Sequence, residues 1–167
     1  MTWLPADFVH PVHVPLPGGG YHLRPIAGTD TELDYPAVMG SRERLWSIYG
    51  EAWGWPAATM TYQQDLDDLV RHERETAAHE SFNYALFDEA ETALLGCVYI
   101  DPPQKAGSDA EISWWVVDEQ VGGELERELD ALVPQWIADA WPFREPCLIG
   151  HEVAWADWLA RPTAVGA

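Results

Sequence analysis

The sequence FNYALFDEAETALLGCVYI, at residues 82–100, contains two apolar runs that flank the polar segment 88–91. Both runs are rich in aromatic and aliphatic residues, and a short polar segment between such runs is typical of a hairpin turn. A third run of the same character, EISWWVV, occupies residues 111–117. We therefore expect successive strands at 82–87, 94–100 and 111–117.

Upstream of this hairpin, the sequence predicts one strand and a helical region. Residues 21–26, YHLRPI, alternate apolar and polar side chains as a half-buried strand does. Residues 29–50 are expected to be helical, and 53–56 form a turn. The local signals in the helical region are Asp34 as a cap, Pro36 in the first turn, Ser41 as a restart and Gly50 as a terminator.

Two further helices flank the three central strands. One opens at Thr61, because Gln64 follows three residues later in a capping-box pattern. The other spans about 124–141, and Pro134 should kink it or end its regular part. Its predicted buried stripe consists of Leu125, Leu129, Leu132 and Trp136.

The end of the chain adds a short strand at 147–149 and a helical turn at 155–159. The order is then strand, two helices, three strands, helix, strand. This order predicts an α+β fold with a mostly antiparallel central sheet and helices on both faces. We expect one domain at 21–167, preceded by an N-terminal arm at 1–20 that supplies an extra strand or leaves the sheet edge to a second subunit.

The composition limits the function classes. The chain has 167 residues, 47% of them hydrophobic, and a formal net charge of -19. Nucleic acids and anionic membranes are not expected partners, because both bind clustered Lys and Arg. The first ten residues lack the features of a secretory signal, and Cys97 and Cys147 lack CxxC spacing, so we expect a cytoplasmic protein with reduced thiols.

The element order and several strings resemble the GNAT acetyltransferases. YHLRPI resembles the opening strand of that family, residues 82–100 its central hairpin, ISWWVV its fourth strand and residues 124–141 its cofactor helix. HESFNYALFD, LLGCVYIDP and WPF are similar to a bacterial GNAT-like subgroup. The resemblance implies acetyl-CoA as cofactor, a small amine or peptide amino terminus as substrate, and a homodimer.

The loop that holds the cofactor pyrophosphate in this family is abnormal here. The family pattern is Arg or Gln, two residues, Gly, one residue, then Gly or Ala; counted from Gln120, Gly123 fits the first glycine but Leu125 stands at the second. Four carboxylates, at positions 118, 119, 124 and 126, surround the helix start, where they stabilise a helix but compete with phosphate. The resemblance still assigns cofactor contacts to Val116, Val117, Gln120, Val121, Gly122, Gly123 and Arg127.

The catalytic candidates are few. Glu111 begins the fourth strand, on the same face as Ser113, and is the best candidate for a base; simple solvation is its structural alternative. The tyrosine that often serves as the acid after the fifth strand is missing, which leaves His151 as a substitute.

Aromatic residues are abundant, with ten tryptophans in the chain. Trp53 and Trp55 lie in the loop where GNAT substrates enter, and with Trp115 and Tyr84 they are candidates for a cleft that takes an apolar or cationic acceptor. The alternative is core packing. Trp114 and Trp115 are adjacent in a strand and must point to opposite faces. We expect no metal site, because the histidines lack nearby ligands of other types.

Two functions remain open from the sequence. One is an acetyl-CoA-dependent N-acetyltransferase in which the amine attacks the thioester directly. The other is a non-catalytic GNAT-fold binding or interaction module with a degenerate cofactor loop, whose cleft between the fourth and fifth strands is filled by side chains.

Overall fold

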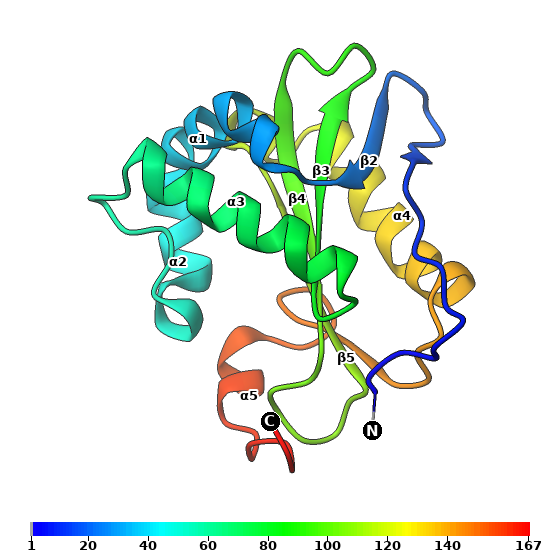
Figure 1. The fold of residues 1–167 in the computed structure, drawn as a ribbon. Helices are drawn as coiled ribbons and strands as arrows, with labels where there is room; N and C mark the ends of the chain where they lie inside the picture. The colour runs from blue at the N-terminus through cyan, green and yellow to red at the C-terminus, as the bar shows by residue number, and fades with distance from the viewer. Residues whose placement is uncertain (1) are drawn as a thin grey trace.

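The computed structural model describes residues 2–167, which form one six-stranded sheet in the order β1-β2-β3-β4-β5-β6 (Figure 1). The strands are β1 (Val14–Pro15), β2 (Tyr21–Pro25), β3 (Phe82–Asp88), β4 (Leu94–Asp101), β5 (Ala110–Val116) and β6 (Pro146–Leu148). The helices are α1 (Thr31–Gly40), α2 (Arg42–Trp53), α3 (Tyr62–Ala77), α4 (Glu124–Ala140) and α5 (Trp155–Leu159), with 3-10 turns at Gly28–Asp30 and Asp118–Gln120.

The sheet is antiparallel from β1 to β5 and ends in one parallel pair. The central hairpin pairs Phe82 with Ile100 and Leu86 with Gly96, and β5 then runs antiparallel to β4. β6 pairs with β5 in parallel over three residues only, from Ala110–Pro146 to Ile112–Leu148. The predicted α+β class and the mostly antiparallel sheet are confirmed.

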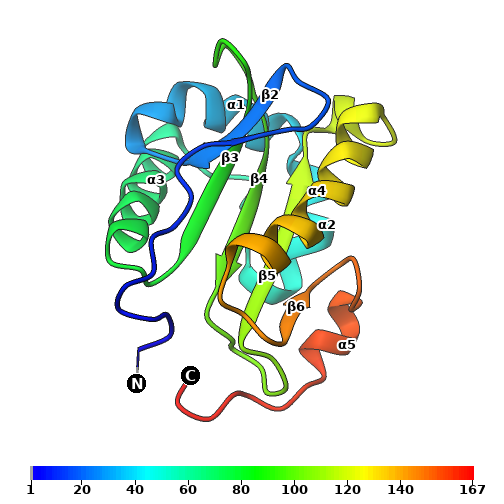
Figure 2. The same cartoon turned by 90° about the vertical axis from the view of Figure 1, so that its right-hand side faces the viewer.

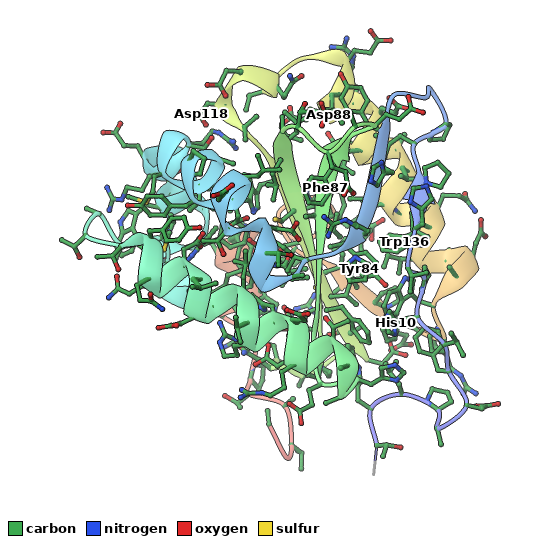
Figure 3. The ribbon with its side chains drawn as sticks, turned by 45° about the horizontal axis from the view of Figure 1, so that its top comes forward. His10, Tyr84, Phe87, Asp88, Asp118 and Trp136 are labelled. Atoms are coloured by element: carbon green, nitrogen blue, oxygen red, sulfur yellow. The ribbon has the colours of Figure 1, made fainter. Side chains whose placement is uncertain are left out.

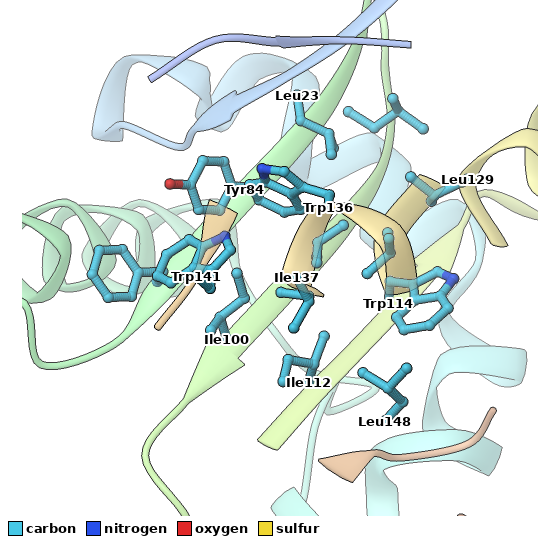
Figure 4. Close-up of a cluster of buried hydrophobic side chains, with 14 of the residues drawn as sticks. Leu23, Tyr84, Ile100, Ile112, Trp114, Leu129, Trp136, Ile137, Trp141 and Leu148 are labelled. Atoms are coloured by element: carbon cyan, nitrogen blue, oxygen red, sulfur yellow. The ribbon is translucent and has the colours of Figure 1, made fainter. Parts of the chain in front are cut away.

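Helices cover both faces of the sheet, as expected. α4 lies across one face and α1, α2 and α3 lie across the other (Figures 1 and 2). The α4 face holds the larger apolar cluster, in which Leu129 and Ile137 pack against strand residues such as Ile112 (Figure 4). Alternation along β5 sends Trp114 to this face and Trp115 to the α1–α3 face, as predicted.

The N-terminal arm packs on the α4 face and adds β1 to the edge of the sheet. The hydroxyl of Tyr84 donates to the carbonyl of Pro11 at 2.6 Å, and the Trp3 ring lies 6.0 Å from the Phe82 ring. Figure 3 shows Tyr84 and Trp136 on the side of the sheet where the arm passes. The extra strand that the arm was expected to supply is therefore a two-residue one.

The helix starts and ends differ from several local predictions. α1 begins at Thr31 after a 3-10 turn, so Asp34 is not a cap but a buried residue within the helix, and Pro36 lies beyond the first turn. α2 continues past Gly50 to Trp53, where Gly54 ends it with a left-handed φ of 63°. The predicted capping box of Thr61 and Gln64 is present.

α4 does not end at Pro134, which was one of the two outcomes expected there. It continues to Ala140, because Val133 and Ile137 are buried on either side of the proline. Packing of an apolar face supplies most of the stability of a helix in a protein, and here it exceeds the loss of one backbone hydrogen bond.

The contact between β4 and β5 at Gly96 has no room for a side chain. A Cβ atom at this position would lie 2.2 Å from the carbonyl oxygen of Trp115. We expect Gly96→Ala to lower the free energy of unfolding by about 3 kcal/mol, because the strands must separate. Gly40→Ala is the control, since a Cβ there meets nothing within 4 Å. Urea unfolding measures both; equal stability of the two variants would contradict the close approach.

Candidate functional site

β5 and β6 diverge after their three paired residues and leave a gap in the sheet. Ile149 donates its N–H to the carbonyl of Ile112, after which Gly150, with φ 81°, turns the chain away. The antiparallel ladder gives the backbone groups of alternate β5 residues to β4, so those of Trp114 and Val116 point into the gap. A cavity of about 250 Å³ occupies this gap, lined by α2, β5, α4 and the segment after β6.

Side chains from α2, from β5 and from the segment after β6 line the walls of the gap. Arg44 reaches from α2 to donate to the carbonyl of Val116, and its Nε donates to Asp118 at 2.6 Å. His151 stacks on Trp114 with the ring centroids 3.4 Å apart and the planes 5° from parallel. The cavity volume is below the several hundred Å³ usual for a ligand pocket.

His151 is the catalytic candidate that lies at the gap. Its side chain is 29% exposed, and its Nδ1 lies 4.0 Å from the Asp130 carboxylate. Burial lowers the pKa of His151 below 6.5, although Asp130 and the Trp114 carbonyl oppose this shift. The imidazole is therefore neutral at pH 7 and able to accept a proton.

The loop before α4 is closed by side chains of the helix that follows it. Gly122 has φ 75°, its N–H donates to Glu126 at 3.0 Å, and its carbonyl accepts from Arg127 at 2.9 Å. Gly123 precedes the helix without a side-chain cap, and a Cβ there would lie 3.2 Å from the carbonyl oxygen of Gln120. Val117 is buried and Val121 is exposed.

The backbone of the gap and loop fits a CoA chain, because the α4 N–H groups have no side-chain cap and the strand groups face the gap. The side chains of Arg44 and His151 narrow the gap, whose cavity holds about 250 Å³. Glu126 holds the glycine N–H that a pyrophosphate would contact. Asp118 lies at the same end of the molecule, above α1 and α2 in Figure 3.

Glu111 and Ser113 line neither this cavity nor the larger cavity on the α1–α3 face. Glu111 is buried rather than solvated, and its Oε1 accepts from the backbone N–H groups of Gln104 and Lys105 and from the indole of Trp158 at 2.8–3.0 Å. Ser113 Oγ accepts from the Tyr49 hydroxyl at 3.2 Å. Glu111 thus anchors the 104–105 loop and α5.

A larger cavity of about 910 Å³ lies on the α1–α3 face. We call it the acidic cavity, because six carboxylic side chains line it together with the aromatic residues Trp53, Trp55 and Tyr99. The carboxylic residues come from α1, α3, the segment after it and β4: Asp34, Asp65, Asp68, Glu75, Glu80 and Asp101.

Three of these carboxyl groups have a raised pKa; Asp34 and Asp65 are buried, and Asp101 is half-buried. Burial raises the pKa of Asp34 well above its usual value, and the neighbouring Asp65 raises it further. Burial likewise raises the pKa of Asp65 and of Asp101 to about 6. The Asp34 and Asp65 carboxyl groups are close enough to affect each other's pKa, and a hydrogen bond between them would require a proton on one of them.

An aromatic layer separates the two cavities. Tyr49 lines the gap and Trp53 lines the acidic cavity, and their rings stack with centroids 4.5 Å apart. Trp115 lies on the gap side of this layer with Trp155, which contacts both Tyr49 and Trp53. Of the four predicted cleft residues, Trp53, Trp55 and Trp115 therefore lie together on one face. Tyr84 is on the opposite face against Trp136, so its placement in the cleft was wrong.

Two residues of the acidic cavity stand out weakly in the sequence. Asn83 is a polar residue inside an apolar strand, and Asp65 lies one helical turn before the buried Leu69. Each signal is local, whereas the cavity joins distant segments.

Several solved structures with a similar arrangement are acetyltransferases. No family model and no curated protein matches the chain. A ribosomal-protein-S5-alanine acetyltransferase from Vibrio fischeri matches with a TM-score of 0.57 and 14% identity, over 77% of this chain and 68% of that one. A ribosomal L7/L12 α-N-protein acetyltransferase in complex with coenzyme A matches with a TM-score of 0.58 and 13% identity, over 74% and 67%. The chain has the GNAT fold.

The GNAT fold also relates the chain to the microcin C7 self-immunity acetyltransferase in complex with acetyl-CoA and AMP. That match has a TM-score of 0.52 and 14% identity, over 72% of this chain and 65% of the other. Within residues 2–167, no three His, Cys, Asp or Glu side chains are grouped to hold a metal ion. In the same part of the chain, no helix has both the length and the apolar character to cross a bilayer.

The contacts of Glu111 lead to a test of its role. Glu111→Ala leaves three N–H donors without their acceptor, of which the Trp158 indole is buried, so we expect a loss of roughly 2–4 kcal/mol in the free energy of unfolding. Glu111→Gln keeps the acceptor oxygen and should lose less than half as much. Chemical denaturation measures both variants. Equal losses in the two would contradict the anchoring role.

Proposed function

We propose that this protein is an acetyl-CoA-dependent N-acetyltransferase that acts on an amine held in the acidic cavity. The observation that carries the proposal is the gap between β5 and β6, which opens onto the uncapped start of α4 and lies one aromatic layer from the acidic cavity. A backbone gap beside a helix N-terminus suits an anionic chain, and the acidic cavity suits a cationic amine.

Residues of the gap would hold the cofactor through backbone groups. The first turn of α4 would offer its N–H groups to the pyrophosphate, and Gly122 and Gly123 would add theirs on release from Glu126 and from the Gln120 carbonyl. Val121 lies in the same loop, and Arg127 bonds to the Gly122 carbonyl. The strand groups at Val116 and Val117 would flank the acyl arm. When bound, the cofactor supplies a thioester carbonyl as electrophile and a thiolate as leaving group.

The protein contributes orientation and a proton acceptor. An ammonium must lose its proton before it attacks, and His151, which lines the gap and is neutral at pH 7, would accept that proton through its ring nitrogen. Direct attack needs the reacting atoms about 3–3.5 Å apart. The stacked pair of Tyr49 and Trp53 must therefore separate when both ligands are bound.

The role of His151 predicts a pH dependence. The pKa of His151 lies below 6.5, so the fraction of neutral imidazole and the acetylation rate should rise with pH through that value and level off above it. His151→Gln should lower kcat by roughly 100-fold and remove this limb of the profile. His13→Gln, in the N-terminal arm, is the control. A limb that survives in His151→Gln would exclude the histidine as the acceptor.

A second function is favoured by the side chains in the gap. The backbone groups that would hold a cofactor already have partners, since Arg44 contacts the Val116 carbonyl and Glu126 the Gly122 N–H. His151 stacks on Trp114 beside them, and no tyrosine follows β6. These features suit a GNAT-fold module that binds an amine cation in the acidic cavity but transfers no acyl group. The two functions differ in one measurable property, which is the affinity for acetyl-CoA.

The variant Glu126→Gln tests the cofactor site. The amide removes a negative charge from the start of α4 and accepts less strongly from the Gly122 N–H than a carboxylate does, so we expect roughly threefold tighter acetyl-CoA binding by calorimetry at low ionic strength. Asp139→Asn, near the other end of α4, removes the same charge and should leave the affinity unchanged. Absence of acetyl-CoA binding by both variants and the unaltered chain would overturn the acetyltransferase and leave the binding module.

A further inference from the structure

We propose that the acidic cavity binds a linear polyammonium ligand, with one end at the Asp34–Asp65 pair, the other at Asp101, and the chain between them over Tyr99. This goes beyond the proposed acyl transfer, because it assigns a ligand class to the cavity whether or not the ligand is acetylated.

The spacing follows from alternate residues of β4. Cys97, Tyr99 and Asp101 share the face that looks toward α1 and α3. The Sγ of Cys97 lies 3.9 Å from the Asp34 carboxyl group, which fixes Asp34 and its partner Asp65 above this residue. Cys97 and Asp101 are four residues apart on β4, which corresponds to about 13 Å along the strand. Asp101 therefore lies that far from Cys97 along the floor of the cavity.

The middle of this span is aromatic. The Tyr99 ring lies 5.4 Å from the Trp53 ring and 6.3 Å from the Trp55 ring, both near perpendicular. Rings in this arrangement pack against methylene groups and attract an ammonium over their faces. The cavity therefore has an acidic end, an aromatic middle and a second acidic end.

An unpartnered acceptor inside the cavity calls for a ligand that donates. Asn83 pairs with Tyr99 across the sheet, is 4% exposed, and its Oδ1 has no donor among residues 2–167. A buried acceptor without a partner is costly. An ammonium has donors and no acceptor, so it satisfies this oxygen and the carboxylates alike.

The cations that line the cavity do not neutralise its two acidic ends. Arg71 is held by Asp68 at 3.3 Å and by Glu75 at 3.1 Å. Burial lowers the pKa of His72, which keeps that ring uncharged at pH 7. None of Asp34, Asp65 and Asp101 forms an ion pair among residues 2–167, although Arg71 offsets part of the negative charge around Asp101. Glu80, which is exposed, adds further negative charge to the lining of the cavity.

Binding a cation at these carboxyl groups should release protons. The pKa of Asp65 and that of Asp101 are about 6, and a nearby ammonium lowers both. Below about pH 7 a part of each group is protonated and must lose its proton on binding. The affinity should therefore rise as the pH increases from 5 to 7.

The experiment is calorimetry on the full chain at low ionic strength, with spermidine and with butylamine, in two buffers of different ionisation enthalpy. We expect spermidine to bind at least about tenfold more tightly than butylamine, with net proton release at pH 6. Asp101→Asn keeps the acceptor for Ser81 and should weaken spermidine about tenfold, while changing butylamine much less.

The matched control is Asp67→Asn, which removes the same charge from the outer face of α3, where Asp67 is exposed and bonds to Gln63. It should change the spermidine affinity less than twofold. Butylamine binding as tightly as spermidine, equal losses in Asp67→Asn and Asp101→Asn, or no proton release by the unaltered chain would each overturn the proposal. Spermidine binding without acetylation would support the ligand class and contradict the acetyltransferase instead.

Discussion

The parallel pairing of β5 with β6 ends after Ile112 and Leu148, and the geometry of the gap depends on where it ends. Gly150 makes this possible, because its φ of 81° is a conformation that other residues rarely adopt. The Trp155 indole also packs where a Cβ of residue 150 would be, 2.8 Å away. The turn and the aromatic packing together direct the chain out of the sheet. They leave the backbone of Trp114 and Val116 without a strand partner on that side.

Negative charge has different consequences at the two cavities. At the start of α4 the carboxylates of Glu124 and Glu126 are near N–H groups and stabilise the helix, so they compete with any anionic ligand. In the acidic cavity, Asp34 and Asp65 are buried next to each other, and Asp101 is half-buried in the field of Glu111 and Glu75, so these carboxyl groups favour a cation. The net charge of -19 describes neither effect, because each depends on local burial.

The sequence predicted the elements of the fold better than the site. The central hairpin and the capping box at Thr61 depend on residues close together in the chain, and both were found. Asp34 looked like a cap because its role depends on burial against α3, which no local pattern contains. Glu111 was predicted to be the base, with solvation at a strand start as the alternative, but the 104–105 loop and α5 cover it.

The acidic cavity was missed for the same reason. Its residues belong to α1, α3 and β4, and only the folded sheet brings them to one face. The aromatic part was anticipated at Trp53 and Trp55, since a short loop carries both. Tyr84 was placed on the wrong face, although strand alternation relative to Ala85 contains that information.

The brevity of β1 and β6 bears on how copies of this protein behave at high concentration. Both strands form edges of the sheet, with two and three residues respectively. Unpaired backbone along a long edge strand recruits strands from other molecules and starts aggregation. Prolines at positions 11, 15 and 17 remove N–H donors next to one edge. The long apolar strands β3 and β4 are therefore enclosed within a sheet whose margins resist intermolecular strand pairing.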